Sequence, residues 1–272
     1  MEKLIEVEYR VYPDPDALAK AAASHLMEIA MKSVAEKGCA NIAVSGGNTP
    51  KNMFAQLAVP TGEYYSAMPW PQLQLFFVDE RMVPPDDQDS NYNMTREAML
   101  GHVPLTPEQV TRIKGELIPE EAAFQYESAI RSRLGLQQAE LPGFDVVQLG
   151  MGDDGHTASL FPHTDALHER HRIAVANYVP QKSAWRVTLT KTAINNAAEV
   201  FFLIGGKDKA EPLRRVLQDP YEPSILPSQL IQPNNDRLLF LLDGDAAARL
   251  PATDANGVGR ISLRRYPKLS ID

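Results

Sequence analysis

Apolar residues in this chain fall into short continuous runs that alternate with longer stretches in which they recur every three or four positions. The continuous runs are typical of strands buried on both faces, and they predict strands over 41–44, 73–78, 144–149, 186–189, 200–204 and 238–242. The longer stretches predict helices over 14–37, 50–57, 120–134 and 209–217. Strands that alternate with helices, with few hairpin signals between them, indicate an α/β fold whose mostly parallel sheet carries helices on both faces.

The alternation contains no internal repeat and no low-complexity linker, so we expect residues 1–250 to form a single domain. Proline-rich and polar stretches predict loops over 59–71, 84–90, 219–236 and 251–259. The segment 251–272 has no clear place in the alternation, and we expect it to be a C-terminal extension of that domain.

The composition is that of a globular protein with a full core. The 272 residues are 44% hydrophobic and 23% charged, which excludes a collagen, a coiled-coil rod and a disordered tail. No apolar run approaches the roughly 18 residues that a membrane span needs, and the charged N-terminal segment has no signal core. The single cysteine, Cys39, cannot form an internal disulfide. We therefore expect a cytoplasmic protein without a membrane partner.

The charge balance limits the possible partners. The chain has 27 Lys and Arg against 35 Asp and Glu, a formal net charge of -8. Such a surface repels nucleic acid at long range, so we expect no nucleic-acid partner. It also repels phosphorylated metabolites, and a phosphate site would need a local cluster of hydrogen-bond donors.

One candidate cluster follows the first predicted strand. Ligands of open parallel sheets bind at the carboxyl ends of the strands, where this chain has Ser45, Gly46, Gly47, Asn48 and Thr49 ahead of a helix. The glycines permit a tight turn, and the helix N-terminus offers free N–H groups to a phosphate. A plain strand-to-helix turn is the alternative. A second alternative is a nucleophile elbow with Ser45 as nucleophile, although this segment lacks the first glycine of that motif.

Two other strand exits carry charged residues. Asp79, Glu80 and Arg81 follow the strand at 73–78, and such groups are costly there unless they face a polar cleft or form a structural ion pair. The planar guanidinium of Arg81 could hold a phosphate or a carboxylate. After the strand at 144–149, the glycines of 150–155 match the dinucleotide-binding fingerprint. Two aspartates there would oppose a pyrophosphate, and Pro162 leaves little room for the helix that this motif requires.

The same glycine-rich segment contains a candidate acid–base pair. His156 is the natural general base, and Asp154 can orient its imidazole ring. Arg186 and Lys209, at later strand and helix starts, are further donors for a phosphate. His168 and His171 could share a metal ion if they were helical, but we interpret them as solvated loop residues and expect no metal site.

These motifs together resemble the 6-phosphogluconolactonase family, which belongs to the superfamily of glucosamine- and galactosamine-6-phosphate isomerases. Three blocks carry the resemblance: Ser-Gly-Gly-Asn-Thr-Pro at 45–50, Phe-Val-Asp-Glu-Arg-Met-Val-Pro at 77–84, and Leu-Gly-Met-Gly-Asp-Asp-Gly-His-Thr-Ala-Ser-Leu-Phe-Pro at 149–162. Shorter similar segments are Ser-Asn at 90–91, Arg-Val-Thr-Leu-Thr at 186–190 and Gly-x-x-Lys-Ala at 206–210. The resemblance extends over about residues 10 to 248.

The resemblance implies a Rossmann-like three-layer α/β/α fold and the hydrolysis of 6-phospho-D-glucono-1,5-lactone to 6-phospho-D-gluconate, the second step of the oxidative pentose phosphate pathway. It implies no metal, no cofactor and a sugar-phosphate lactone as substrate, and we expect a monomer or a homodimer. The alternative is a glucosamine-6-phosphate deaminase. In that branch a tyrosine stands in place of Arg81, and Ile-Ala-Phe-Asn-Glu-Pro follows the histidine, so both positions favour the lactonase.

The chemistry of a lactonase suits these residues. His156 would activate water as general base, Asp154 would orient it, and either Arg81 or main-chain N–H groups of 150–157 would stabilise the oxyanion. The substrate phosphate would bind to the loop 45–49 together with Arg186 and Lys209. Asp79 would bind sugar hydroxyls. The alternatives that remain are a serine hydrolase, a metal hydrolase and a non-catalytic sugar-phosphate sensor.

Overall fold

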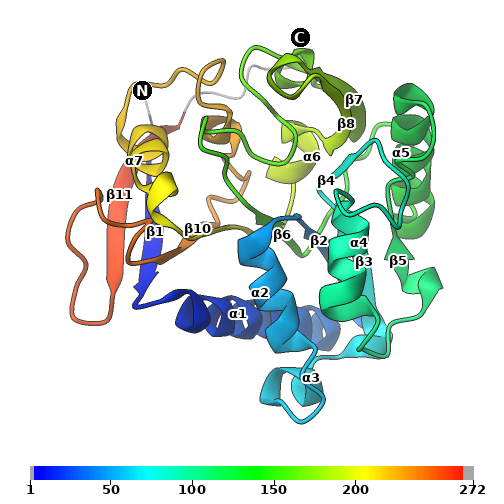
Figure 1. The fold of residues 1–272 in the computed structure, drawn as a ribbon, viewed down its shortest axis with the longest axis horizontal. Coiled ribbons are helices and arrows are strands. Elements are labelled where there is room, and N and C mark those ends of the chain that lie inside the picture. Colours follow the sequence, from blue (N-terminus) through cyan, green and yellow to red (C-terminus); the bar gives the residue numbers. More distant parts are fainter. Residues whose placement is uncertain (1–2, 266–272) are drawn as a thin grey trace.

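The computed structural model describes residues 3–265 and is organised around an eight-stranded sheet (Figure 1). In spatial order the strands are β11 (Val258–Arg265), β1 (Lys3–Tyr12), β10 (Leu238–Asp243), β9 (Val200–Ile204), β6 (Val146–Leu149), β2 (Ala40–Val44), β3 (Leu73–Phe77) and β5 (Val110–Thr111). Neighbouring strands are parallel except β1 and β11, which are antiparallel. The fold is therefore the mostly parallel α/β fold that the sequence predicts.

The helices cover both faces of this sheet. They are α1 (Pro15–Lys37), α2 (Asn48–Leu57), α3 (Glu63–Ala67), α4 (Asn91–Thr95), α5 (Pro119–Leu134), α6 (Lys191–Asn195) and α7 (Ala210–Gln218). From β1, the crossovers that contain α1 and α2 take the chain toward the β5 edge of the sheet. From β5, the crossovers that contain α5 and α7 take it back toward β10. Because crossovers are right-handed, α1 and α2 belong to one face and α5 and α7 to the other. The contact between α1 and α2 agrees with a shared layer (Figure 1).

The winding direction reverses between β2 and β6. The chain continues from β2 to β3 and β5 on one side of this point, and from β6 to β9 and β10 on the other. The crossovers on the two sides lie on opposite faces, so the loops that follow β2 and β6 diverge and leave a crevice at the carboxyl ends of these strands. The topology thus predicts a ligand site between residues that follow Val44 and Leu149.

The expected strand at 186–189 exists, but it is not part of the parallel sheet. It lies in β8 (Ala184–Leu189), the centre of an antiparallel three-stranded sheet with β4 (Asp79–Arg81) and β7 (Ala174–Val179). The sequence signal of this hairpin is weak, because the connection from Pro180 to Ser183 contains no glycine. Ser183 itself adopts a left-handed conformation with φ 47°.

Part of the expected C-terminal extension belongs to the sheet: Val258–Arg265 form β11 and pair antiparallel with residues 3–10 of β1. The remaining residues, 266–272, lie outside the described part of the chain. Strand β1 was not predicted either, because its apolar residues Ile5, Val7 and Tyr9 alternate with charged ones. Such a period-2 pattern gives no continuous apolar run.

Tyr126 of α5 completes the hydrogen bonding where β3 ends. Its buried hydroxyl donates to the Phe77 carbonyl at 2.5 Å and accepts the Phe77 N–H at 2.8 Å. The ladder between β3 and β5 covers only Leu75 and Phe76, so the tyrosine takes the place of a strand partner. This contact holds the chain immediately before it enters β4.

We expect Tyr126→Phe to lower the free energy of unfolding by about 1–3 kcal/mol, because it leaves a buried N–H and a buried carbonyl of Phe77 without partners. Urea denaturation measures the change. Tyr178→Phe is the matched control, since the Tyr178 ring is 45% exposed and its substitution should change stability by less than about 0.5 kcal/mol. An equal effect of the two substitutions would contradict this account of Tyr126.

Candidate active site

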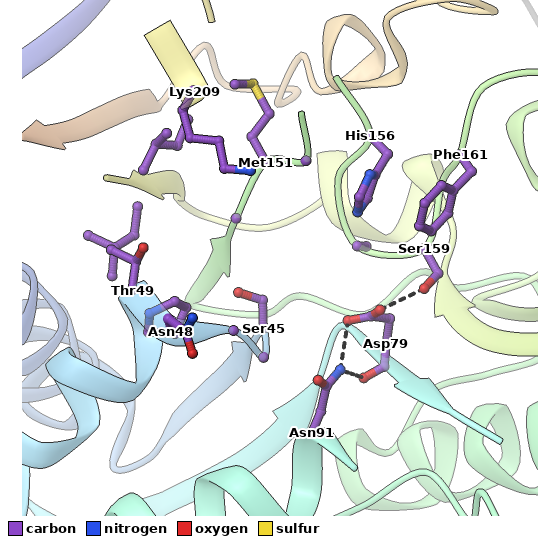
Figure 2. Close-up of a pocket in the computed structure, with 18 of the residues that line it drawn as sticks. Ser45, Asn48, Thr49, Asp79, Asn91, Met151, His156, Ser159, Phe161 and Lys209 are labelled. Carbon is purple, nitrogen blue, oxygen red and sulfur yellow. Dashed lines mark hydrogen bonds between the residues drawn. The ribbon is translucent and has the colours of Figure 1, made fainter. Parts of the chain in front are cut away.

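A polar pocket of about 460 Å³ lies at the carboxyl ends of β2 and β6, where the topology predicts it (Figure 2). Its volume is in the range of small-molecule sites. All the predicted site residues except Asp154 line it: Ser45, Gly46, Gly47, Asn48, Thr49, Asp79, Arg81, His156, Arg186 and Lys209. The structure thus brings together residues that are more than 160 positions apart in the sequence.

The loop after β2 enters α2 through a turn that requires a glycine. Gly47 has φ 113°, a conformation that residues with a side chain rarely adopt, and α2 begins directly after it at Asn48. Figure 2 shows Asn48 and Thr49 at the start of this helix beside the pocket. The helix N-terminus therefore faces the pocket, as expected for an anion-binding loop.

The loop after β6 carries the predicted histidine–aspartate pair. Asp154 Oδ1 lies 2.5 Å from His156 Nδ1 and accepts the His156 main-chain N–H at 3.0 Å. Gly152 is needed for this turn, because a Cβ atom there would lie 2.0 Å from His156 Nδ1. No helix follows β6 directly, so the Gly150–Gly155 segment lacks the helix N-terminus of a dinucleotide site.

The imidazole of His156 is held on two sides. Its ring stacks on Phe161 with the centroids 3.8 Å apart and an angle of 19° between the planes, and Asp154 holds Nδ1. Burial would raise the pKa of Asp154, but its hydrogen bonds and charge interaction with His156 outweigh burial and lower the pKa. Asp154 is therefore a carboxylate at neutral pH, and it can orient the ring and stabilise a positive charge on it.

The two strands β4 and β8 present charged side chains to the pocket. In their ladder Asp79 lies opposite Thr188, and Arg81 lies opposite Arg186. Because side chains alternate between the faces of a strand, these four share one face, and Glu80 is on the other. The side chains of Asp79 and Arg81 therefore lie on the pocket side of β4.

Glu80 is a structural residue. Its carboxylate accepts the main-chain N–H groups of Asn91 and Tyr92 at 2.7 and 2.8 Å, and the Ser90 hydroxyl at 3.0 Å. It thereby caps α4. Burial raises the pKa of Glu80, and these N–H donors partly oppose that rise.

Asp79 is held rigidly at the floor of the pocket. Ser159 donates its hydroxyl to one carboxylate oxygen at 2.6 Å, and the Asn91 amide donates to the other at 3.2 Å and to the Asp79 carbonyl at 2.9 Å (Figure 2). All three residues are buried. The sequence blocks contain Asn91 and Ser159, but nothing in their spacing shows that they meet Asp79.

Arg81 and Arg186 form a pair of like charges. Such a pair is unfavourable across two strands unless something compensates for it. Within residues 3–265, the Nε atom of each guanidinium is buried without a hydrogen-bond partner. Burial lowers the pKa of Arg186, although nearby Asp79 raises it and the group stays charged. Both arginines line the pocket, and a planar guanidinium group is suited to an anionic ligand.

Two lysines add to the positive charge of the pocket. Lys209 follows β9 and forms an ion pair with Asp208 at 3.0 Å, in a turn whose Gly206 N–H is held by the buried carboxylate of Asp243 at 2.9 Å. Lys182 was not predicted, because it comes from the turn between β7 and β8. The pocket thus concentrates cations on a protein of net charge -8.

The arrangement does not support the other chemistries considered from the sequence. The Ser45 hydroxyl bonds to Gln148 and has no hydrogen bond to His156 in the described structure, so a serine nucleophile lacks its base. Among residues 3–265 no group of three or more His, Cys, Asp or Glu side chains is placed to hold a metal ion. No helix in this part of the chain is long and apolar enough to cross a membrane.

Comparison with known proteins agrees with the geometry. A family model described as glucosamine-6-phosphate isomerases/6-phosphogluconolactonase matches residues 13–240. A 6-phosphogluconolactonase of Nostoc sp. is 36% identical over 252 residues, which cover 92% of this chain and 99% of that protein. One of Synechocystis sp. is 38% identical over 221 residues, which cover 80% and 88%.

Solved structures show the same fold. The 6-phosphogluconolactonase from Trypanosoma cruzi superposes with a TM-score of 0.79 at 31% identity, over 92% of this chain and 99% of that one. A monomeric glucosamine-6-phosphate deaminase, at 21% identity and a TM-score of 0.70 over 89% and 99%, shares the fold alone. This chain therefore belongs to the family of glucosamine-6-phosphate isomerases and 6-phosphogluconolactonases.

Proposed function

We propose that this protein hydrolyses 6-phospho-D-glucono-1,5-lactone to 6-phospho-D-gluconate without a cofactor. The observation that carries the proposal is the Asp154–His156 pair beside a cation-rich pocket. The relatives named as 6-phosphogluconolactonases, which align with most of the chain, support it. The product places the enzyme second in the oxidative pentose phosphate pathway.

The proposed reaction uses His156 as the base. With Nδ1–H donated to Asp154, the neutral ring keeps a lone pair at Nε2, which takes a proton from water as the water oxygen attacks C1 of the lactone. The bond between C1 and the ring oxygen then breaks, and the imidazolium returns the proton to that oxygen. Asp154 stabilises the imidazolium between the two steps.

Positive charge near the reacting carbon stabilises the oxyanion that forms in this step. Arg81 has a buried, unpaired Nε and lines the pocket, and the main-chain N–H groups of residues 150–157 are alternative donors. Arg186 lies directly opposite Arg81 in the strand ladder and adds positive charge to the same pocket.

The remaining groups bind the rest of the substrate. We assign the phosphate to the loop 45–49 with Arg186 and Lys209, because this set combines a helix N-terminus with two cations. We assign a sugar hydroxyl to Asp79, whose carboxylate is held by the Ser159 hydroxyl. A monomer or a homodimer stays a prediction. A cytoplasmic location stays a prediction that rests on the single cysteine.

A direct assay tests the function. Lactone generated freshly from glucose 6-phosphate should be hydrolysed far faster than it hydrolyses spontaneously, with 6-phosphogluconate followed through a coupled dehydrogenase. Addition of a chelator should leave the rate unchanged, and glucosamine 6-phosphate should release no ammonia. Folded protein that fails to accelerate lactone hydrolysis would contradict the proposal, and ammonia release would favour the deaminase branch.

Replacing the base tests the mechanism. His156→Ala should lower kcat by about 10²–10⁴-fold with little effect on folding, because it removes proton transfer but no buried apolar group. Steady-state kinetics on the phosphorylated lactone measure the change. His168→Ala, at an exposed position, is the control and should behave as wild type. A kcat close to wild type in the His156 variant would remove this residue from the mechanism.

The phosphate assignment predicts an effect on KM. Lys209→Ala and Arg186→Ala should each raise KM by roughly 10–10²-fold, the equivalent of one charge-assisted hydrogen bond. Lys207→Ala removes an exposed neighbouring charge and serves as control. If KM were unchanged in both pocket variants, the phosphate would have to bind elsewhere.

A further inference from the structure

Gln148 is a fully buried amide in the centre of the parallel sheet. It lies in β6, where the other residues, Val146, Val147 and Leu149, are all apolar and buried. An amide removed from water is costly unless its polar atoms are hydrogen-bonded. A hydrophobic side chain would suit this position better unless the amide has a specific partner.

That partner is Ser45, the first residue of the loop after β2. Gln148 Oε1 accepts the Ser45 main-chain N–H at 3.1 Å and lies 3.2 Å from its hydroxyl, and Gln148 Nε2 donates to the same hydroxyl at 2.9 Å. In the described structure every side-chain hydrogen bond of Gln148 goes to this one serine. The two strands pair directly, so the amide spans a single strand spacing.

We propose that Gln148 is a positioning residue for substrate phosphate: it fixes the backbone and the hydroxyl of Ser45 so that the loop 45–49 is already in its binding geometry before the substrate arrives. This inference rests on the proposed function and deepens it. None of the motifs that identify the loop includes Gln148.

The hydrogen-bond pattern explains how the amide would act. In the free protein the Ser45 hydroxyl can give its hydrogen to Gln148 Oε1 while it accepts from Nε2. When a phosphate oxygen reaches the loop, the hydroxyl hydrogen turns toward it, and Nε2 continues to donate to the serine oxygen. A hydroxyl that accepts a hydrogen bond is a stronger donor, so this arrangement favours the anion.

Positioning also reduces the cost of binding. The two residues after Ser45, Gly46 and Gly47, have wide conformational freedom because glycine has no side chain. If the substrate had to order them, the entropy lost on binding would weaken its affinity. Gln148 anchors the residue before them, and α2 anchors the residues after them. The loop is thus held at both ends.

The experiment compares the hydrolysis of 6-phospho-D-glucono-1,5-lactone with that of glucono-1,5-lactone, which lacks the phosphate. Gln148→Met preserves side-chain length but removes the amide. It should raise KM for the phosphorylated lactone about tenfold and change kcat little. The preference, which is the ratio of kcat/KM for the phosphorylated lactone to kcat/KM for the unphosphorylated one, should therefore fall about tenfold. Gln148→Glu keeps an acceptor for the Ser45 N–H, loses the donor and adds negative charge, and it should lower that preference further.

Two further variants show whether the effect passes through Ser45. Ser45→Ala should lower the same preference, and the double variant Ser45→Ala/Gln148→Met should lose less than the product of the two single effects, because both remove one interaction. Gln74→Met is the matched control: it removes an amide from β3 in the same sheet, away from the pocket, and should leave both lactones' kinetics unchanged.

The outcomes separate this inference from the proposed function. Wild-type protein without lactonase activity would overturn the proposed function and the positioning role with it. Normal wild-type activity with an unchanged preference in both Gln148 variants would overturn the positioning role alone. An equal loss of kcat/KM on both lactones would also overturn the positioning role, because it would indicate general damage to the protein. Effects of Gln148→Met and Ser45→Ala that multiply fully in the double variant would overturn it too, because they would show that the two residues act independently. If Gln148→Met does not fold, Gln148→Glu carries the same test.

Discussion

The pairing of β2 with β6 is the constraint on which the rest of the site depends. These strands are parallel neighbours at the point where the sheet reverses its winding, so their carboxyl ends lie together while the chain leaves them in opposite directions. The glycine-rich loop after β2 and the histidine loop after β6 therefore face a common crevice.

Buried polar side chains hold the pocket loops in place. Gln148 holds Ser45 after β2, Asp243 holds Gly206 after β9, and Ser159 holds Asp79 after β3. Each contact joins two segments that are far apart in the chain. A buried polar group is favourable only when it is satisfied, so these contacts stabilise one loop geometry over its alternatives. The sheet thus supplies both the location of the pocket and its rigidity.

The electrostatics of the pocket oppose those of the protein as a whole. An acidic chain concentrates Arg81, Arg186 and two lysines around one pocket, and it holds the two arginines opposite each other. Their repulsion and their unpaired Nε atoms are unfavourable in the free protein. In the proposed function, the negative charge of the substrate or the transition state would offset this repulsion, so the pair would favour an anionic ligand.

The sequence by itself determined what depends on short-range chemistry. Continuous apolar runs predicted the central strands, such as 200–204, and the short spacing of Asp154 and His156 predicted their pairing, because a tight turn brings such residues together. Two kinds of feature escaped it. Strands β1 and β11 lack a continuous apolar run, and β7 joins β8 through a turn without glycine. Only the tertiary structure placed Arg81 opposite Arg186, Asn91 on Asp79 and Gln148 on Ser45. These contacts depend on strand order and register, which join segments up to about a hundred residues apart and leave no local pattern in the chain.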